Sequence, residues 1–208
     1  FTLMNTGNKS VRSVSGLVGG DGMKMRQYCF RGEAMSGGYV SEVIAEALSM
    51  AESNACMCRI VAAPTAGACG VLPAVLLPLC KYEEISQHQL LEALYVASGI
   101  GAIIARRACI AGASGGCQAE IGTASAMAAG ALVALRGGTG QQIGHAVAMA
   151  LKNLMGLVCD PVAGLVEVPC VKRNVIGAVN AVSVADMAMA GITSRIPVDE
   201  VIDAMGEV

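Results

Sequence analysis

Apolar residues recur at helical spacing along most of the chain, in segments separated by glycine and proline. Ser86 with Gln89 matches a capping box, and Pro197 suits the first position of a helix. Gly156 is placed to end the helix that opens at Thr139. The pattern predicts helices over residues 42–52, 71–79, 86–105, 118–135, 139–155 and 174–190, with a last one from 197. Glycine- or proline-rich loops are expected at 16–22, 63–70, 114–116 and 159–170.

This pattern predicts an all-α fold in which the glycine and proline loops gather between the helices. We find no repeat period and no linker, so we expect a single helical domain over residues 1–208. Only 3% of the residues are aromatic, which suits closely packed helices and is poor material for a sheet. The net charge of −2, without any basic run, argues against nucleic acid as a partner.

The high apolar fraction, 54%, raises the question of a membrane. The longest uncharged run, Ile60–Cys80, is long enough to span a bilayer but contains three prolines. The run Ile121–Leu135 is too short. We therefore expect no membrane span and attribute the apolar residues to burial, including an interface in a homo- or hetero-oligomer.

The nine cysteines are scattered and odd in number, which does not describe a disulfide framework. No secretion signal is recognisable, so we expect reduced thiols in the cytoplasm. The abrupt start at Phe1 and end at Val208 suggest a piece of a longer polypeptide, truncated at both ends.

Three cysteines, Cys117, Cys159 and Cys170, sit beside glycine or proline instead of inside periodic apolar stretches. Cys117 falls where a glycine loop becomes a helix, and there we expect the helix dipole to favour the thiolate. Three thiolates converging on iron would leave one coordination position open for Lewis-acid chemistry. The spacing lacks the C-x2-C pairs of zinc ribbons and ferredoxins, so spacing alone favours the alternative of buried thiols acting as small hydrophobes.

Three segments carry a resemblance to a known family: Gly112-Ala-Ser-Gly-Gly-Cys117-Gln-Ala-Glu120, Lys152-Asn-Leu-Met-Gly-Leu-Val-Cys159-Asp-Pro-Val-Ala-Gly-Leu-Val-Glu-Val-Pro-Cys170 and Ala63-Pro-Thr-Ala-Gly-Ala68. They closely resemble the alpha chain of bacterial iron–sulfur-dependent L-serine dehydratases. The resemblance implies a helical catalytic domain that converts L-serine to pyruvate and ammonia. It also implies an oxygen-sensitive [4Fe-4S] cluster on Cys117, Cys159 and Cys170, a regulatory beta subunit or domain, and a C-terminal tail.

Substrate contacts are expected from two loops, because backbone N–H groups in glycine loops can bind the serine carboxylate. The candidate residues for binding substrate are Thr65, Ala66, Gly67, Ser114, Gly115, Gly116 and Asn153. The base that removes the α-proton is open between Lys152 and His145. Glu120 and Asp160 are further candidates, with helix compensation and capping as their alternatives.

Other functions stay open at this point. The same residues suit another [4Fe-4S] hydro-lyase acting on a small hydroxy acid, or a non-catalytic helical interaction module with inert cysteines. A pyridoxal-phosphate dehydratase would need an αβ framework, for which the sequence gives no signal. The remaining cysteines are expected to be bystanders, with Cys69 the one to watch because it neighbours the Thr65 loop.

Overall fold

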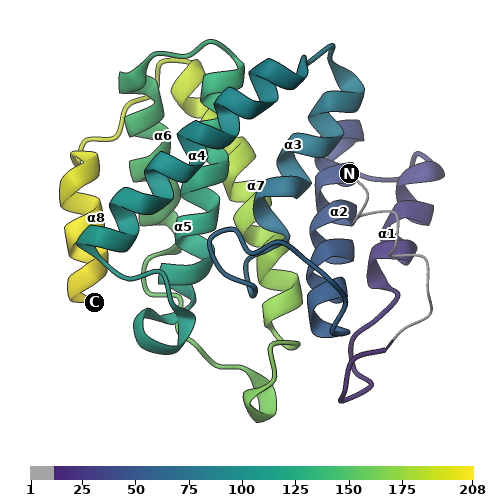
Figure 1. Cartoon of the computed structure of the whole chain (residues 1–208). Coiled ribbons are helices and arrows are strands. Elements are labelled where there is room, and N and C mark those ends of the chain that lie inside the picture. The colour runs from purple at the N-terminus through teal and green to yellow at the C-terminus, as the bar shows by residue number, and fades with distance from the viewer. Residues whose placement is uncertain (1–11) are drawn as a thin grey trace.

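The computed structural model describes residues 12–208 and contains no strand in that range, which confirms the all-α prediction (Figure 1). Residues 1–11 of the expected domain lie outside the described residues. The helices are α1 (Asp21–Phe30), α2 (Gly37–Ala55), α3 (Val71–Tyr82), α4 (Gln87–Arg107), α5 (Gly112–Leu135), α6 (Gly140–Leu154), α7 (Cys170–Met189) and α8 (Val198–Glu207), with one 3-10 turn, η2 (Val162–Gly164).

Helix α5 forms the centre of the bundle and packs against α3, α4, α6 and α7 (Figure 1). From Cys117 to Val133 every residue but Glu120 is buried, and most are alanine, glycine or serine. A helix that is apolar or small on all sides can only be a core helix. Small residues let the neighbouring helices approach closely: a Cβ on Gly101 of α4 would lie 2.9 Å from Sδ of Met127 on α5.

Local signals located the middle helices correctly. Both Ser86 and Thr139 are N-caps in complete capping boxes, at the starts of α4 and α6. The run Ile60–Cys80 is no continuous helix, because α3 begins only at Val71. Three starts differ from the prediction. Helix α2 begins at Gly37, five residues before the predicted 42. Helix α7 begins at Cys170, four residues early, and residues 112–115 add a helical turn before a break at Gly116.

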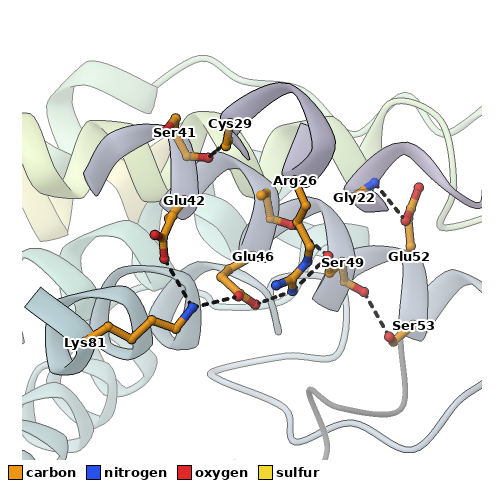
Figure 2. Close-up of polar contacts among 11 residues, drawn as sticks. Gly22, Arg26, Cys29, Ser41, Glu42, Glu46, Ser49, Glu52, Ser53 and Lys81 are labelled. Atoms are coloured by element: carbon orange, nitrogen blue, oxygen red, sulfur yellow. Dashed lines mark hydrogen bonds and ion pairs between the residues drawn. The ribbon is translucent and has the colours of Figure 1, made fainter. Parts of the chain in front are cut away.

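Helix α1 was not predicted, because residues 16–22 were expected to be a loop. It begins at Asp21, after Gly20, which has no side chain to cap it. The carboxylate of Glu52 on α2 supplies the cap instead, accepting from the backbone N–H groups of Asp21 at 2.7 Å and Gly22 at 3.1 Å (Figure 2). Glu52 lies 30 residues after Gly22 in the sequence, so no local pattern could reveal this helix start.

Helices α1, α2 and α3 are further joined by charged contacts, which together with the Glu52 cap we call the α2 polar network (Figure 2). The carboxylate of Glu46 is buried and lies between two cations, 2.9 Å from Nη2 of Arg26 and 3.8 Å from Nζ of Lys81. Lys81 also contacts Glu42 at 3.1 Å. The network fastens α1 and α3 to opposite sides of α2 through groups that satisfy one another.

Among the described residues, α4 is the helix long and apolar enough to cross a membrane, and 22% of its most apolar window is buried. The two runs considered from sequence do not meet this criterion. A single helix of this kind is weak evidence for a membrane span, because length and composition alone do not separate a spanning helix from one that packs on protein.

Candidate functional site

Cys117 begins the long, buried part of α5. Gly116 interrupts the helix with φ 73° and ψ 177°, a left-handed φ that favours glycine. A Cβ there would also lie 3.0 Å from the carbonyl oxygen of Leu157, so glycine permits a close approach of the segment after α6. The backbone N–H of Gln118 donates to that same carbonyl at 2.8 Å. The break at Gly116 therefore starts the long part of α5 at Cys117 and leaves room for the segment that leads to Cys159.

Cys159 is held beside Cys117 by this packing. The side-chain oxygen of Gln118 accepts from the N–H of Gly156 at 2.7 Å, and a Cβ on Gly116 would lie 3.7 Å from the backbone nitrogen of Cys159. The thiol of Cys117 is 3% exposed, while that of Cys159 lies at the surface. Of this pair of cysteines, Cys117 therefore lies in the protein interior and Cys159 lies at the surface, open to water.

Cys170 is the first residue of α7, and Asn174 one turn later fixes its surroundings. Asn174 is fully buried, and its amide nitrogen donates to the carbonyl oxygens of Cys170 at 3.1 Å and Gly67 at 2.8 Å. Its side-chain oxygen accepts from the N–H of Gly70 at 2.9 Å. One amide thus ties the 63–70 loop to the turn that carries Cys170.

Arg173 joins the elements that carry Cys117 and Cys159. Its Nη1 lies 3.1 Å from Sγ of Cys117, 2.9 Å from the carbonyl oxygen of Val158 and 2.6 Å from Oδ1 of Asp160. This nitrogen has only two hydrogens, so the three acceptors share them. The guanidinium is 9% exposed and provides a positive charge beside the buried thiol.

The three thiols act on one another electrostatically. Burial raises the pKa of Cys117, and the charge of Cys159 raises it further, while Arg173 acts in the opposite direction. Burial and then the charge of Cys117 raise the pKa of Cys170 to about 11. Arg173, three residues after Cys170, contacts both Cys117 and the residue before Cys159, so the three cysteines lie in one region of the structure. The expectation that the helix start favours a thiolate at Cys117 is wrong for this geometry, because burial outweighs it.

Within residues 12–208, no three His, Cys, Asp or Glu side chains converge closely enough to hold a single metal ion. Three thiolates bound to three corners of an iron–sulfur cubane stand wider apart than three ligands around one ion. The chemistry of the donors fits such a cluster: two of the thiols begin helices, and the arginine beside them offsets negative charge.

The first predicted substrate loop lies against Glu120. The hydroxyl of Thr65 donates to Oε1 of Glu120, and a Cβ on Gly67 would lie 2.7 Å from either carboxylate oxygen. A Cβ on Gly112 would lie 3.0 Å from Oε2. Ala66, the middle residue of the loop, is exposed. Glu120 therefore sits between the two glycine loops and joins them.

The second predicted loop is more regular than expected. The hydroxyl of Ser114 pairs with Sγ of Cys109 at 2.9 Å, and this hydrogen bond lowers the pKa of the Cys109 thiol. A Cβ on Gly115 would lie 2.7 Å from that of Ala119, so the turn needs glycine for packing. Ser114 is exposed and next to the kink that positions Cys117.

Two of the three candidates on α6, Asn153 and His145, lie away from the thiols along their helices, and the third, Lys152, lies at the surface. Asn153 donates to Oδ1 of Asn180 at 2.8 Å, ten residues or about 15 Å along α7 from Cys170. Lys152 is exposed, and its Nζ lies 3.7 Å from Sδ of Met155. His145 is half-buried, nine residues or about 14 Å along the axis before the end of α6.

Arg173 and Asn174 were missed by sequence reasoning. Both follow Cys170 within four residues, and a charged and an amide side chain at the start of an apolar helix were the available signal. Their partners, Cys117 and the 67–70 turn, are distant in sequence, so the roles of the two side chains appear only in three dimensions.

The structure is a helical bundle in which two of the three predicted ligand cysteines, Cys117 and Cys170, lie at helix starts. The chain matches the family "Serine dehydratase alpha chain" over residues 2–208, and it belongs to that family. This confirms the resemblance seen in the three cysteine and loop segments.

Individual relatives agree with this assignment. The chain is 51% identical over 199 residues to the "Probable L-serine dehydratase, alpha chain" of Bacillus subtilis (strain 168), covering 96% of this chain and 66% of that protein. It is 45% identical over 192 residues to the "L-serine dehydratase, alpha chain" of Peptoniphilus asaccharolyticus, covering 92% and 66%. It is 45% identical over 163 residues to "L-serine dehydratase 2" of Escherichia coli (strain K12), covering 77% and 36%. The chain thus spans just under two thirds of the two alpha chains and about a third of the longer protein.

Proposed function

We propose that this chain is the catalytic alpha part of a lyase that converts L-serine to pyruvate and ammonia. Family membership and the names of the relatives support the reaction. The observation that carries the chemistry is the gathering of Cys117, Cys159 and Cys170 at one site. Buried thiols with raised pKa values are costly to ionise alone, and a metal cluster bound to them removes that cost.

The residues that would hold a [4Fe-4S] cluster are Cys117, Cys159 and Cys170. When bound by three thiolates, such a cluster supplies an iron with an open position, a Lewis acid that assists departure of a hydroxyl group. Arg173 would keep the thiolate of Cys117 in place through its hydrogen bond and charge. Asn174 would keep the Cys170 turn in register with the 63–70 loop.

Binding of serine is assigned to the two glycine loops. Backbone N–H groups at residues 65–67 and 114–116 are suited to the carboxylate, because glycine allows a close approach. Glu120 offers a carboxylate for the serine ammonium, and its bond to the Thr65 hydroxyl holds the first loop in place. The substrate would then lie between these loops, on the side where Cys159 is open to water.

The chemistry conserves its atoms without an external oxidant. Loss of the α-proton and of the β-hydroxyl as water gives aminoacrylate, which tautomerises to an imine. Hydrolysis of the imine consumes one water, which balances the one released, and yields pyruvate and ammonia. Lys152 and His145 stay candidates for the base. Of the further candidates, Glu120 is the carboxyl group whose charge acts on both Cys117 and Cys170.

The partners follow from the same proposal. The alpha-chain names of the relatives imply a beta chain, and the length beyond this chain in those relatives leaves room for further segments. We place the enzyme in the cytoplasm, where thiols stay reduced.

The test is a serine deaminase assay under anaerobic conditions. The chain, reconstituted with iron and sulfide and co-expressed with a beta chain, is incubated with L-serine, and pyruvate and ammonia are measured. We expect the two products in equal amounts. A cluster-loaded complex that leaves L-serine unchanged and dehydrates another small hydroxy acid would replace the proposal with the alternative hydro-lyase.

A further inference from the structure

The outer side of α4 has the spacing of a helix–helix seam. Its inner side packs on α5 through the buried residues Ala93, Ala97, Gly101 and Ile104. On the other side, the wider exposed surface includes one row of residues at alternate intervals of four and three, the spacing by which one helix packs along another. These seam residues are His88, Glu92, Tyr95, Gly99, Ala102 and Arg106.

Two large side chains on this side face water. Tyr95 is 70% exposed and Ile103, next to the seam, is 52% exposed. Helix α4 crosses the front of the bundle in Figure 1, and less than a quarter of its most apolar window is buried. Apolar surface of this extent on a long helix is typical of an interface.

Gly99 lies at the middle of the seam, and the chain itself gives no reason for glycine there. A Cβ at Gly99 would meet nothing within 4 Å, whereas a Cβ at Gly101 would lie 2.9 Å from Met127. Glycine in an exposed helix interior lowers helix stability relative to alanine. A small residue is useful at such a position where a second helix crosses closely.

The charges on the seam suggest the identity of that second helix. Glu92 lies seven residues before Gly99, and Arg106 lies seven residues after it. We propose that α4 packs antiparallel against α4 of a second copy of this chain, around a twofold axis at Gly99. In this arrangement Glu92 faces Arg106 of the second copy, Tyr95 faces Ile103, and the two glycines meet at the crossing.

Within the described part of the chain, Arg106 has no ion-pair partner, and Glu92 has only a contact of 3.5 Å to His88, between two highly exposed side chains. Lipid tails offer no opposite charge for Glu92 or Arg106. A segment from a longer chain would carry the complementary charges at these two positions only by coincidence. A second copy matches it by symmetry. The inference does not depend on the proposed reaction.

A charge-swap experiment tests the arrangement. Sedimentation velocity is measured for the wild-type chain over about 1–200 μM, a range that covers weak interfaces. The variants are Glu92→Arg, Arg106→Glu and the double variant. Arg31→Glu, just after α1, is the matched control; it breaks the exposed Arg31–Glu33 pair at 3.3 Å and the cation–π contact of Arg31 with Tyr28. Circular dichroism verifies that each variant is folded.

We expect a concentration-dependent dimer in the wild type and the control. Each single swap places like charges opposite each other and should weaken the dimer at least about tenfold, while the double variant restores it. Gly99→Leu should abolish the dimer without lowering the thermal midpoint of the monomer, because its side chain has open space in the monomer.

Three results would overturn the proposal. The first is a wild-type chain that stays monomeric at the highest concentration. The second is a double variant as weak as the single ones, which would assign the face to a different partner or arrangement. The third is a chain that is monomeric in buffer but co-sediments with phosphatidylcholine vesicles through this face, which would assign α4 to a membrane.

Discussion

The α2 polar network and the cysteine site both bury polar groups near the start of a helix, but they balance charge differently. In the network, the carboxylate of Glu52 accepts two backbone N–H groups at the start of α1, and Glu46 lies between Arg26 and Lys81. Every buried carboxylate there has donors from this chain. The network is therefore complete as it stands and contributes to stability.

At the cysteine site, burial raises the pKa values of Cys117 and Cys170, and the buried cation is a single guanidinium. Arg173 is moreover shared with Val158 and Asp160. Three thiolates there would exceed the positive charge the chain provides. The comparison indicates that the network serves the fold, and it supports the proposal that a positively charged group completes the cysteine site.

The strongest way to break this comparison is to remove a thiol. We expect Cys159→Ala to abolish both iron binding and serine deamination, because the cluster loses one of its three ligands. Its thiol is at the surface, so the free energy of unfolding of the iron-free chain should change little. Iron content and pyruvate formation are measured, with Cys58→Ala, another exposed cysteine, as the control. Full turnover in Cys159→Ala would show that the ligand assignment is wrong.

Removing the arginine affects both fold and site. Arg173→Met leaves the thiol of Cys117 and the carbonyl of Val158 without their donor, and we expect a loss of about 2 kcal/mol in the free energy of unfolding. Iron retention should also fall, because the positive charge beside Cys117 is lost. Urea denaturation of the iron-free chain and iron content after gel filtration measure the two effects. Stability and iron retention both equal to wild type would remove Arg173 from this role.

The Thr65 hydroxyl separates substrate binding from cluster binding. Thr65→Val removes the hydrogen bond to Glu120, and we expect the Michaelis constant for L-serine to rise about tenfold, or about 1.4 kcal/mol, with iron content unchanged. Thr65→Ser retains the hydroxyl and should keep the constant near that of the wild type. An unchanged constant in Thr65→Val would exclude Thr65 from the substrate site.

A change in the α2 network should affect stability alone. Glu52→Ala removes the acceptor for two N–H groups at the start of α1, and we expect a loss of about 1 kcal/mol. Iron content and the Michaelis constant should stay as in the wild type. Glu33→Ala, an exposed acid on the same side of the molecule, is the stability control. A loss of iron in Glu52→Ala would show that the two regions are not independent.

The smallest expected effect concerns Glu167, which lies on the loop before Cys170. Hydrogen bonds from Ser13 and Ser15 hold the pKa of Glu167 below its ordinary value. The stabilisation is therefore full above the carboxyl pKa of the unfolded chain, about 4.3, and is lost as the pH falls through the lower folded value. Urea unfolding at pH 7 and pH 3.5 should give a smaller difference for Ser15→Ala than for the wild type. Equal differences would contradict this assignment.

Sequence reasoning succeeded where the signal was local. The capping boxes at Ser86 and Thr139 contain both partners within four residues. The run 60–80 is interrupted before Val71, as expected, although Pro73 and Pro78 lie inside α3. The three cysteines stood out by their glycine and proline neighbours, and their role as ligands of one cluster stays a prediction.

The signal failed where the deciding contact is distant. Helix α1 depends on Glu52, and the start of α7 depends on Asn174, whose amide bonds the 67–70 turn. Arg173 was not singled out, because its partner Cys117 is 56 residues away. Asn153 was expected to contact the substrate, but it donates to Asn180 on α7.

The most direct test of the central claim is the iron and acid-labile sulfide content of the chain after anaerobic reconstitution. We predict about four of each per chain for the wild type, and loss of both in Cys117→Ala, Cys159→Ala and Cys170→Ala. A wild-type chain without bound iron, or iron that all three variants retain, would contradict the claim that these three thiols hold one cluster.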